Sequence, residues 1–369
     1  MGGFVRLPME SPMRPLLLAL AASLVTVSAA SAQWVTRDER RAPRGEWNWA
    51  LPRELPALYR EFNGIDFGHA HLAQALLGAQ DSSSVETARL QVLEFIFSGP
   101  EVPPDEELVA PDFARAVWEA QRAFGWAHQL HRSLYDLFAS DRVEDKDAAY
   151  RQILADYLSK PEAITSHALD HHGALWGFPE SRAFSKRFPK FNAQIWAYHW
   201  LQAAVYDVQV EGGASLQREQ MPKVISWYHG YLANPPLDWQ FMPLMREAAP
   251  AFAERFPEAA VIFDNLHMLH DNVDDVLSSP EIYTSLAAKR SAVVGILDIY
   301  LHRNHEPGER YGAYHARNGH GDGHMETGPA AGRPMGVRPP SAREVLEGTA
   351  VEPVRVTGET PSPGGGHEH

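Results

Sequence analysis

Histidine and aspartate share one face of the segment 261–277, at spacings that suit a metal ion. On a helix of 3.6 residues per turn the polar side chains fall on a single arc of about 140°, opposite the apolar side chains. These polar residues are Asp264, His267, His270, Asp271, Asp274 and Asp275. Steps of three and four residues bring four of them within reach of one ion. We therefore take as principal candidate ligands His267, His270, Asp271 and Asp274.

The composition of this face favours a bound cation over plain exposure to solvent. It uses aspartate, histidine and asparagine, which are poor helix formers, and carries no lysine or arginine. Carboxylates at such spacing repel one another unless a positive charge lies among them. A divalent metal ion would supply that charge. An amphipathic helix that turns the same face to water is the alternative.

Other segments also direct histidines toward their apolar side. A helical wheel gives this placement for His69 in 62–76, His128 and His131 in 124–138, and His167 and His171 in 164–175. Along 191–209, His199 lies with Gln202 and Tyr206 in a polar stripe on an otherwise apolar and aromatic helix. Buried imidazoles cost free energy unless each finds a hydrogen-bond or metal partner. A single such residue is most simply a hydrogen-bonded core histidine, but several helices that each send one inward favour a shared ion. The candidate partner ligands are His199, His128, His131, His167 and His171.

A short internal echo predicts that two of these histidines meet. The tripeptide Arg-Phe-Pro occurs at 187–189 and at 255–257, and a histidine follows each proline ten residues later, at His199 and His267. Proline is favoured at the first position of a helix, so both helices should start alike and carry their histidines to one level. A chance coincidence of three residues is the alternative.

The available donors restrict the metal. Imidazole and carboxylate suit zinc, copper, iron or manganese. The chain has no cysteine, which excludes thiolate sites, iron–sulfur clusters and covalently attached haem. The Glu-x-x-His pairs of ferritin-like sites and the His-Glu-x-x-His motif of zinc proteases do not occur.

Three functions fit these features, and the sequence does not decide whether the protein is an enzyme. The leading hypothesis is a helical protein that binds a transition-metal ion through core histidine and aspartate, as a metal-dependent oxidoreductase or for metal sequestration. The second is a non-catalytic binding or scaffold protein, with a small-molecule or protein partner, whose histidines are structural. The third, based on tryptophan and tyrosine near the histidines, is an electron carrier with non-covalent haem.

The elements that must position these residues are helices. From 51 to 305 apolar residues recur at three- and four-residue spacing between proline and glycine breaks, which predicts an all-α, multi-helix bundle. Residues 33–50 are polar and are expected to form a linker. Residues 306–369 are rich in glycine and proline and poor in large apolar side chains, which predicts a disordered C-terminal tail. Its histidines either bind metal weakly or belong to a merely solvated tail.

The N-terminus predicts export. Two arginines precede an apolar run that ends in Ala30, Ser31 and Ala32, as in a secretory signal peptide of residues 1–32. The expected location is periplasmic or secreted, with an uncleaved membrane anchor as the alternative. No later segment predicts a membrane span. The net charge of -14 disfavours nucleic acid as a partner, because an acidic surface repels phosphates.

Overall fold

Prolines and capping side chains set where the helices begin. The computed structural model describes residues 43–78, 81–170, 175, 177–235, 243–304 and 339–350. Within these ranges, prolines start helices at Pro56, Pro111, Pro189, Pro250 and Pro257. Proline suits this position because its fixed φ is helical and the first backbone N–H has no partner in the helix. Elsewhere the side chain of Asp81, Asp105, Asp145 or Ser285 accepts a hydrogen bond from the first turn.

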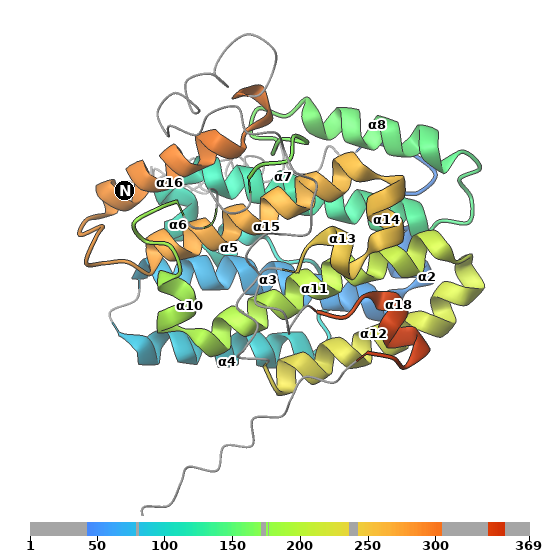
Figure 1. Cartoon of the computed structure of the whole chain (residues 1–369), viewed down its shortest axis with the longest axis horizontal. Coiled ribbons are helices and arrows are strands. Elements are labelled where there is room, and N and C mark those ends of the chain that lie inside the picture. The colour runs from blue at the N-terminus through green and yellow to red at the C-terminus, as the bar shows by residue number, and fades with distance from the viewer. Residues whose placement is uncertain are drawn as a thin grey trace, which may run out of the picture. The chain divides into compact units, whose positions relative to one another are not determined.

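The helices fall into two consecutive sets. The first set is α2 (Ala50–Glu54), α3 (Pro56–Gly78), α4 (Ser82–Phe97), α5 (Glu106–Val109), α6 (Pro111–Ala116), α7 (Trp118–Ala139) and α8 (Lys146–Leu158). The second set is α10 (Ala183–Arg187), α11 (Pro189–Glu211), α12 (Ala214–Ala233), α13 (Met245–Ala248), α14 (Pro250–Arg255), α15 (Pro257–Leu277) and α16 (Leu286–Tyr300). A 3-10 turn, η1 (His302–Asn304), and the short helix α18 (Ala342–Glu347) follow. Figure 1 shows these elements in chain order.

Four long helices that carry inward-facing histidines each follow a short helix across a single non-helical residue. These hinge residues are Leu55, Val117, Phe188 and Phe256, with φ between -138° and -128° and ψ between 56° and 61°. The short helix turns away at the hinge while its last carbonyls still accept hydrogen bonds. The four long helices α3, α7, α11 and α15 therefore begin in the same way.

The two sets are an internal repeat. The segment α5–α7 contains Ala-Pro-x-Phe and, further on, His-x-x-His and Asp, and the segment α13–α15 repeats them 139 positions later. The matched pairs are Ala110 and Ala249, Pro111 and Pro250, Phe113 and Phe252, His128 and His267, His131 and His270, and Asp136 and Asp275. In the same way α2–α3 corresponds to α10–α11 at an offset of 133, the spacing of Pro56 and Pro189. We call residues 49–140 the first half and residues 182–279 the second half.

An equivalent carboxylate, partly buried in the first half and buried in the second, ties the beginning and end of each half together. Asp136 in α7 accepts hydrogen bonds from the backbone N–H groups of Trp49 and Leu51, at 3.0 and 2.7 Å. Asp275 in α15 accepts them from Arg182 and Phe184, at 2.6 and 2.8 Å. Trp49 and Arg182 both have positive φ, 65° and 69°, which is uncommon for residues other than glycine. The repeat thus extends to unusual backbone geometry.

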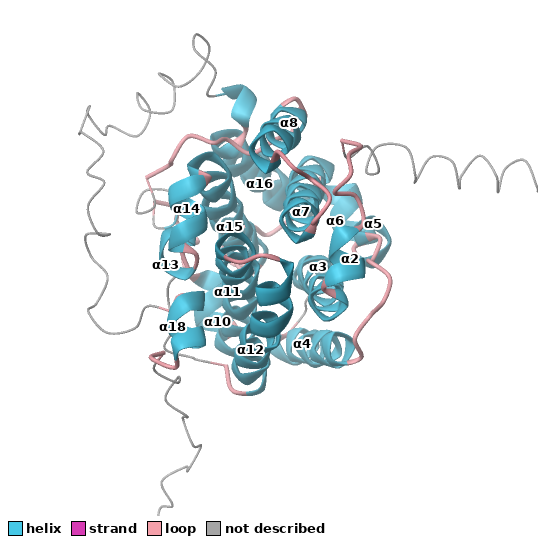
Figure 2. Ribbon diagram, turned by 90° about the vertical axis from the view of Figure 1, so that its right-hand side faces the viewer, coloured by secondary structure: helices cyan, strands magenta, loops and turns pink. Residues whose placement is uncertain are grey.

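The four long helices lie side by side in the middle of the described chain, as Figure 2 shows. The helix α4 packs on α3, α12 on α11, α8 on α7 and α16 on α15. Gly68 allows α3 to approach α11 closely, because a Cβ atom at this position would lie 2.9 Å from the ring of Tyr198. Large aromatic side chains fill much of the interior, and Trp200, Tyr206 and Tyr228 are fully buried.

The predicted all-α, multi-helix fold is confirmed. The only β-type pairing in the described residues is an isolated bridge between Ile164 and Leu301. Among the described helices, none combines the length and apolarity needed to cross a bilayer. Residues 339–350 are an exception within the stretch predicted to be disordered, since α18 packs on α11 and α12 and Trp200 donates a hydrogen bond to the carbonyl of Pro340 at 2.8 Å. The predicted signal peptide and most of the predicted linker lie outside the described residues.

Candidate metal centre

Six histidines from four helices are buried together between the two halves. His69 comes from α3, His128 and His131 from α7, His199 from α11, and His267 and His270 from α15. Their exposed fractions lie between 0% and 8%. We call this group the histidine cluster. Its members belong to four segments that lie far apart in the sequence. Only the packing of the four long helices brings these segments together.

The rings contact one another directly. His69 Nε2 lies 3.1 Å from His199 Nε2, and the centroids of the His69 and His270 rings are 4.5 Å apart. The rings of His199 and His267 stack at 4.0 Å with an interplanar angle of 8°. The expectation that the two Arg-Phe-Pro helices bring His199 and His267 to one level is therefore confirmed. Such close contact between imidazoles favours a small ion among them over a planar porphyrin.

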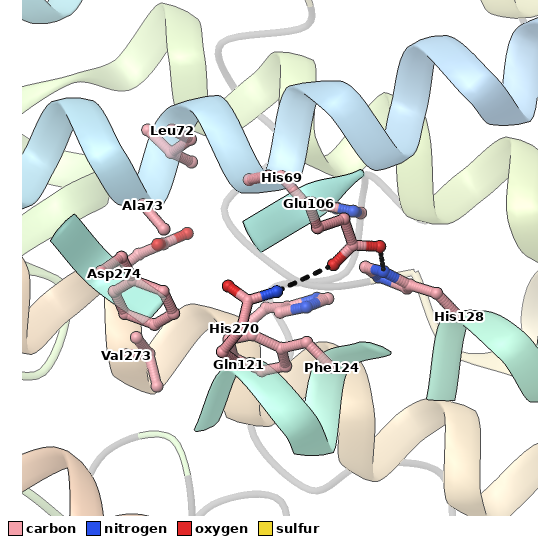
Figure 3. A pocket seen from close by; sticks show the side chains of 12 residues that line it. His69, Leu72, Ala73, Glu106, Gln121, Phe124, His128, His270, Val273 and Asp274 are labelled. Atoms are coloured by element: carbon pink, nitrogen blue, oxygen red, sulfur yellow. Dashed lines mark hydrogen bonds and ion pairs between the residues drawn. The ribbon is translucent and has the colours of Figure 1, made fainter. Parts of the chain in front are cut away.

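Three members of the cluster converge on a small cavity. The ligand atoms of His69, His128 and His270 all lie within 4.8 Å of one another. Figure 3 shows these three residues around the pocket, which Glu106 and Asp274 also border. The cavity volume is about 20 Å³, which exceeds the roughly 10–15 Å³ that one water molecule requires. These buried groups could hold one metal ion. We call His69, His128 and His270 the first half-site.

A carboxylate holds the ring of His128. Its Nδ1 lies 2.7 Å from Glu106 Oε1, so Nδ1–H donates to the carboxylate and Nε2 is left toward the other histidines. Burial lowers the pKa of His128, but the nearby carboxylates of Glu106 and Asp66 outweigh it and raise the pKa to about 9. Asp66 itself is bound by the guanidinium of Arg132. Asp66, Glu106 and His128 also lie close enough to share an ion, but Arg132 already pairs with Asp66, and the ring of His128 already pairs with Glu106.

Two tyrosines hold the ring of His131. The hydroxyls of Tyr135 and Tyr206 each lie 3.0 Å from His131 Nδ1. Tyr135 donates its single proton to the carbonyl of Gln202 at 2.8 Å, so its contact with His131 requires a proton on Nδ1. The lone pair of His131 is therefore on Nε2. Fixing one ring nitrogen in this way is the arrangement that orients metal-bound histidines.

Eight of the twelve ring nitrogens in the cluster have no hydrogen-bond partner among the described residues. They are His69 Nδ1, His128 Nε2, His131 Nε2, His199 Nδ1, and both nitrogens of His267 and His270. Buried polar atoms are rarely left in this state, because each lost hydrogen bond costs about 1–3 kcal/mol. The arrangement is unfavourable for structural histidines and suits ligands of a cation.

Burial keeps most of these rings neutral. Burial, reinforced by neighbouring imidazoles, lowers the pKa well below its usual value for His69, His131, His199 and His270. The pKa of His267 is lowered to about 3 for the same reasons. A neutral imidazole offers the lone pair that a metal ion needs. His128 differs, because its proton must leave before Nε2 becomes one of three neutral donors.

The aspartates of α15 are used differently from the sequence-based expectation. The carboxylate of Asp275 receives two backbone N–H groups at the start of α10, and that of Asp264 receives the N–H of Met245 at 2.8 Å. Asp274 borders the cavity. Burial, and then the carboxylates of Asp271 and Asp275, raise the pKa of Asp274 well above its usual value. Asp271 is partly buried and is not among the side chains that border the cavity.

The expectation for the segment 164–175 was wrong where the structure describes it. Residues 164–170 form a loop rather than a helix, and His167 is exposed. An inward direction for His167 requires helical periodicity, and this stretch is not helical because Ile164 pairs with Leu301. His171 lies outside the described residues.

Sequence reasoning missed one residue of the first half-site, His69, and also Glu106, the carboxylate that holds His128. His69 was recognised as inward-facing but was not included among the ligands, although Asp66 and His69 form an Asp-x-x-His pair one helical turn apart. Glu106 carried no signal, because it starts a helix of four residues and meets His128 only through packing.

Comparison of the chain with protein-family models, with curated proteins and with solved structures found no match. The function is therefore argued from the site alone.

Proposed function

We propose that this protein binds a transition-metal ion in the histidine cluster, with His69, His128 and His270 as ligands. The observation that carries the proposal is the set of eight buried ring nitrogens without hydrogen-bond partners among the described residues. Three of the rings, from three different helices, already lie within 4.8 Å of one another at their ligand atoms. One bound ion would accept the lone pairs of these three rings together.

The donors favour zinc or copper over manganese. The first half-site offers imidazole nitrogens, which suit zinc, copper and iron, whereas manganese prefers oxygen ligands. Glu106 would orient His128 through Nδ1, as carboxylates commonly do for metal-bound histidines. Asp274 is the carboxylate of the predicted ligand set that borders the same cavity.

Three protein ligands leave a position open on the ion, as in catalytic rather than structural sites. The cavity of about 20 Å³ has room for a molecule of the size of water. These two features support metal-dependent chemistry on a very small molecule over chemistry on a large substrate. The export signal predicted from residues 1–32 would place this activity in the periplasm or outside the cell.

The non-catalytic alternative, in which the histidines are structural, predicts different contacts in the histidine cluster. Structural histidines should have hydrogen-bond partners, but in the described residues only four of the twelve ring nitrogens have one. A metal-sequestering protein would bind the ion through the same ligands but would carry out no chemistry at the open position. The first test therefore concerns binding and not activity.

The test is elemental analysis of the full chain, purified without an affinity tag from cells grown in metal-replete medium. The proposal predicts at least one zinc, copper or iron ion per chain, and its loss in His69→Gln and His270→Gln. The control is His71→Gln, because His71 lies two residues after His69 and its ring contacts Gln91 at 3.1 Å instead of the cluster. Metal content below about 0.2 per chain, or equal content in the control and the cluster variants, would refute the proposal.

A further inference from the structure

The internal repeat assigns a counterpart to every member of the first half-site. At the offset of 139, His128 corresponds to His267, and His270 corresponds to His131. At the offset of 133, His69 corresponds to Gln202. We call Gln202, His267 and His131 the second half-site. Each half-site takes two side chains from one half of the molecule and one from the other.

The second half-site is as deeply buried as the first. The exposed fractions are 2% for Gln202, 0% for His267 and 2% for His131. All three come from long helices that meet in the histidine cluster, and the rings of His131 and His267 are nearly parallel with centroids 6.3 Å apart. The repeat therefore brings a second set of buried polar groups to the middle of the molecule.

Every member of the second half-site has an unused donor atom for a metal ion. Gln202 Oε1, His131 Nε2 and both ring nitrogens of His267 are buried without a hydrogen-bond partner among the described residues. The His131 lone pair is on Nε2, because Nδ1–H donates a hydrogen bond to the hydroxyl oxygen of Tyr135. An amide oxygen and two neutral imidazoles are acceptable ligands for a divalent transition metal.

A fourth group stands beside this set. His199 occupies the place in the second half that Asp66 occupies in the first, and its Nδ1 is also unpartnered among the described residues. Its ring stacks on that of His267 at 4.0 Å, so an ion bound by His267 would lie at the ring edge and not between the two rings. His199 Nε2 contacts His69 Nε2 at 3.1 Å, which makes His199 the link between the two half-sites.

We infer that the cluster holds two metal ions, the second bound by His131, His267 and the amide oxygen of Gln202. This inference rests on the proposed function, since it adds a second ion to the same cluster. The two ions would be related by the internal repeat, and each would bridge the two halves of the chain. A dinuclear centre then explains why the cluster contains six imidazoles where three or four suffice for one ion.

The test is the number of Co²⁺ ions bound per chain, measured by native mass spectrometry after chelation and reloading. The experiment uses the full chain with His315, His320, His324, His367 and His369 replaced by glutamine, so that these histidines contribute no binding. The inference predicts saturation at two Co²⁺ per chain. It predicts one ion in His267→Gln, one in Gln202→Leu, one in His128→Gln, and two in the His71→Gln control.

The outcomes separate this inference from the proposed function. Saturation at one Co²⁺, lost in His128→Gln and retained in His267→Gln, overturns the second site and leaves the proposed function intact. One ion that is lost in both variants also overturns it, because the cluster is then a single site. No bound Co²⁺ in the parent chain overturns both. The stoichiometry of the parent decides between one ion and two even if a variant fails to fold.

Discussion

The two halves of the molecule share a backbone but differ in the chemistry they bring to the cluster. Both use a short helix, a hinge residue and a long helix, and both anchor the start of the half with an aspartate, Asp136 or Asp275. In the first half-site a carboxylate, Glu106, holds the candidate ligand His128. In the second, the phenols of Tyr135 and Tyr206 hold His131.

The charged residues at equivalent positions differ even more between the two halves. The first half contains the buried ion pair of Asp66 and Arg132, and the corresponding positions of the second half hold His199 and Asp271. The same two backbone positions thus carry an ion pair in one half, and an imidazole and a carboxyl group in the other. Burial, and then the carboxylate of Asp275, raise the pKa of Asp271 well above its usual value. Capping and hinge geometry fix the positions, while the residue types there are free to diverge.

The largest expected difference between the halves concerns these charges. Arg132→Met leaves the carboxylate of Asp66 without its partner, and we expect it to lower the free energy of unfolding by about 3 kcal/mol. Asp271→Asn removes a carboxyl whose ionisation is unfavourable in the folded state, so stability at pH 7 should stay within about 0.5 kcal/mol of the parent or rise. Urea denaturation of the metal-free chain measures both. Equal losses in the two variants would mean that the charge difference between the halves has no energetic consequence.

The second prediction uses pH to separate the half-sites. Because the pKa of His128 is raised to about 9, a metal ion must displace its proton, and affinity at the first half-site should rise about tenfold per pH unit from 7 to 9. The pKa of His267 is lowered to about 3, so the second half-site should show no such dependence on this ring. Calorimetric titration with Zn²⁺ in two buffers of different ionisation enthalpy counts the protons released.

The raised pKa of His128 also affects the stability of the metal-free protein, in the direction opposite to its effect on metal affinity. A histidine whose pKa is raised by folding stabilises the folded state fully below its ordinary value near 6.5, and this contribution is lost as the pH rises toward 9. We therefore expect the metal-free chain to lose stability over this interval and the metal-bound chain to gain affinity. Release of no proton per ion at pH 7 would contradict the assignment of His128 as a ligand.

The third prediction compares the groups that orient the ligands. Glu106→Gln removes the charge that fixes His128, and we expect a 10- to 100-fold loss of Zn²⁺ affinity at the first half-site. Tyr206→Phe removes one of the two hydroxyls near His131, so the loss at the second half-site should be smaller, below about tenfold. Competition with a chromophoric chelator measures both affinities. Exposed Glu94→Gln is the control, and an effect of that variant as large as that of Glu106→Gln would refute the role of Glu106.

The smallest expected contrast tests the shared scaffold. Asp136→Ala and Asp275→Ala each leave two backbone N–H groups without an acceptor, and each should lower the free energy of unfolding by about 1–2 kcal/mol. Burial raises the pKa of both aspartates to about 6. Each aspartate should therefore reduce stability as the pH rises from about 4 to 6, and both alanine variants should lose this dependence equally. Thermal unfolding as a function of pH provides the comparison, and clearly unequal effects would show that the repeat is not energetically equivalent.

The helices and the meeting of His199 with His267 could be predicted, because both follow from local signals. Proline at 189 and 257 starts the two helices, and equal spacing from proline to histidine brings the two rings together. The inward direction of His128 and His131 followed from helical periodicity. These properties depend on residues within a few turns of one another.

The partners of Asp264 and Asp275 could not be predicted, since they are distant in the sequence. Asp275 is bound by backbone N–H groups of residues 182 and 184, which carry no side-chain signature. This face carries no lysine or arginine, and two of its carboxylates are bound instead by backbone N–H groups at helix N-termini. The loop at 164–170 was also mispredicted, because its bridge to Leu301 is a long-range contact.

One available signal was overlooked. The repeat of Ala-Pro-x-Phe and His-x-x-His at an offset of 139 is present in the sequence and is visible when the chain is compared with itself. It would have shown that 128–131 and 267–270 are equivalent, and that a ligand set should draw on both. The Arg-Phe-Pro tripeptides relate two helices of the second half to each other, at an offset of 68 residues, and are a separate pattern.

The most direct test of the metal-binding claim is anomalous X-ray diffraction from crystals of the full chain soaked or grown with Zn²⁺, collected at the zinc absorption edge. Metal binding at the first half-site predicts an anomalous peak bounded by His69, His128 and His270, with metal–nitrogen distances of about 2.0–2.1 Å. A peak confined to exposed residues such as His167, with none in the histidine cluster, would contradict it.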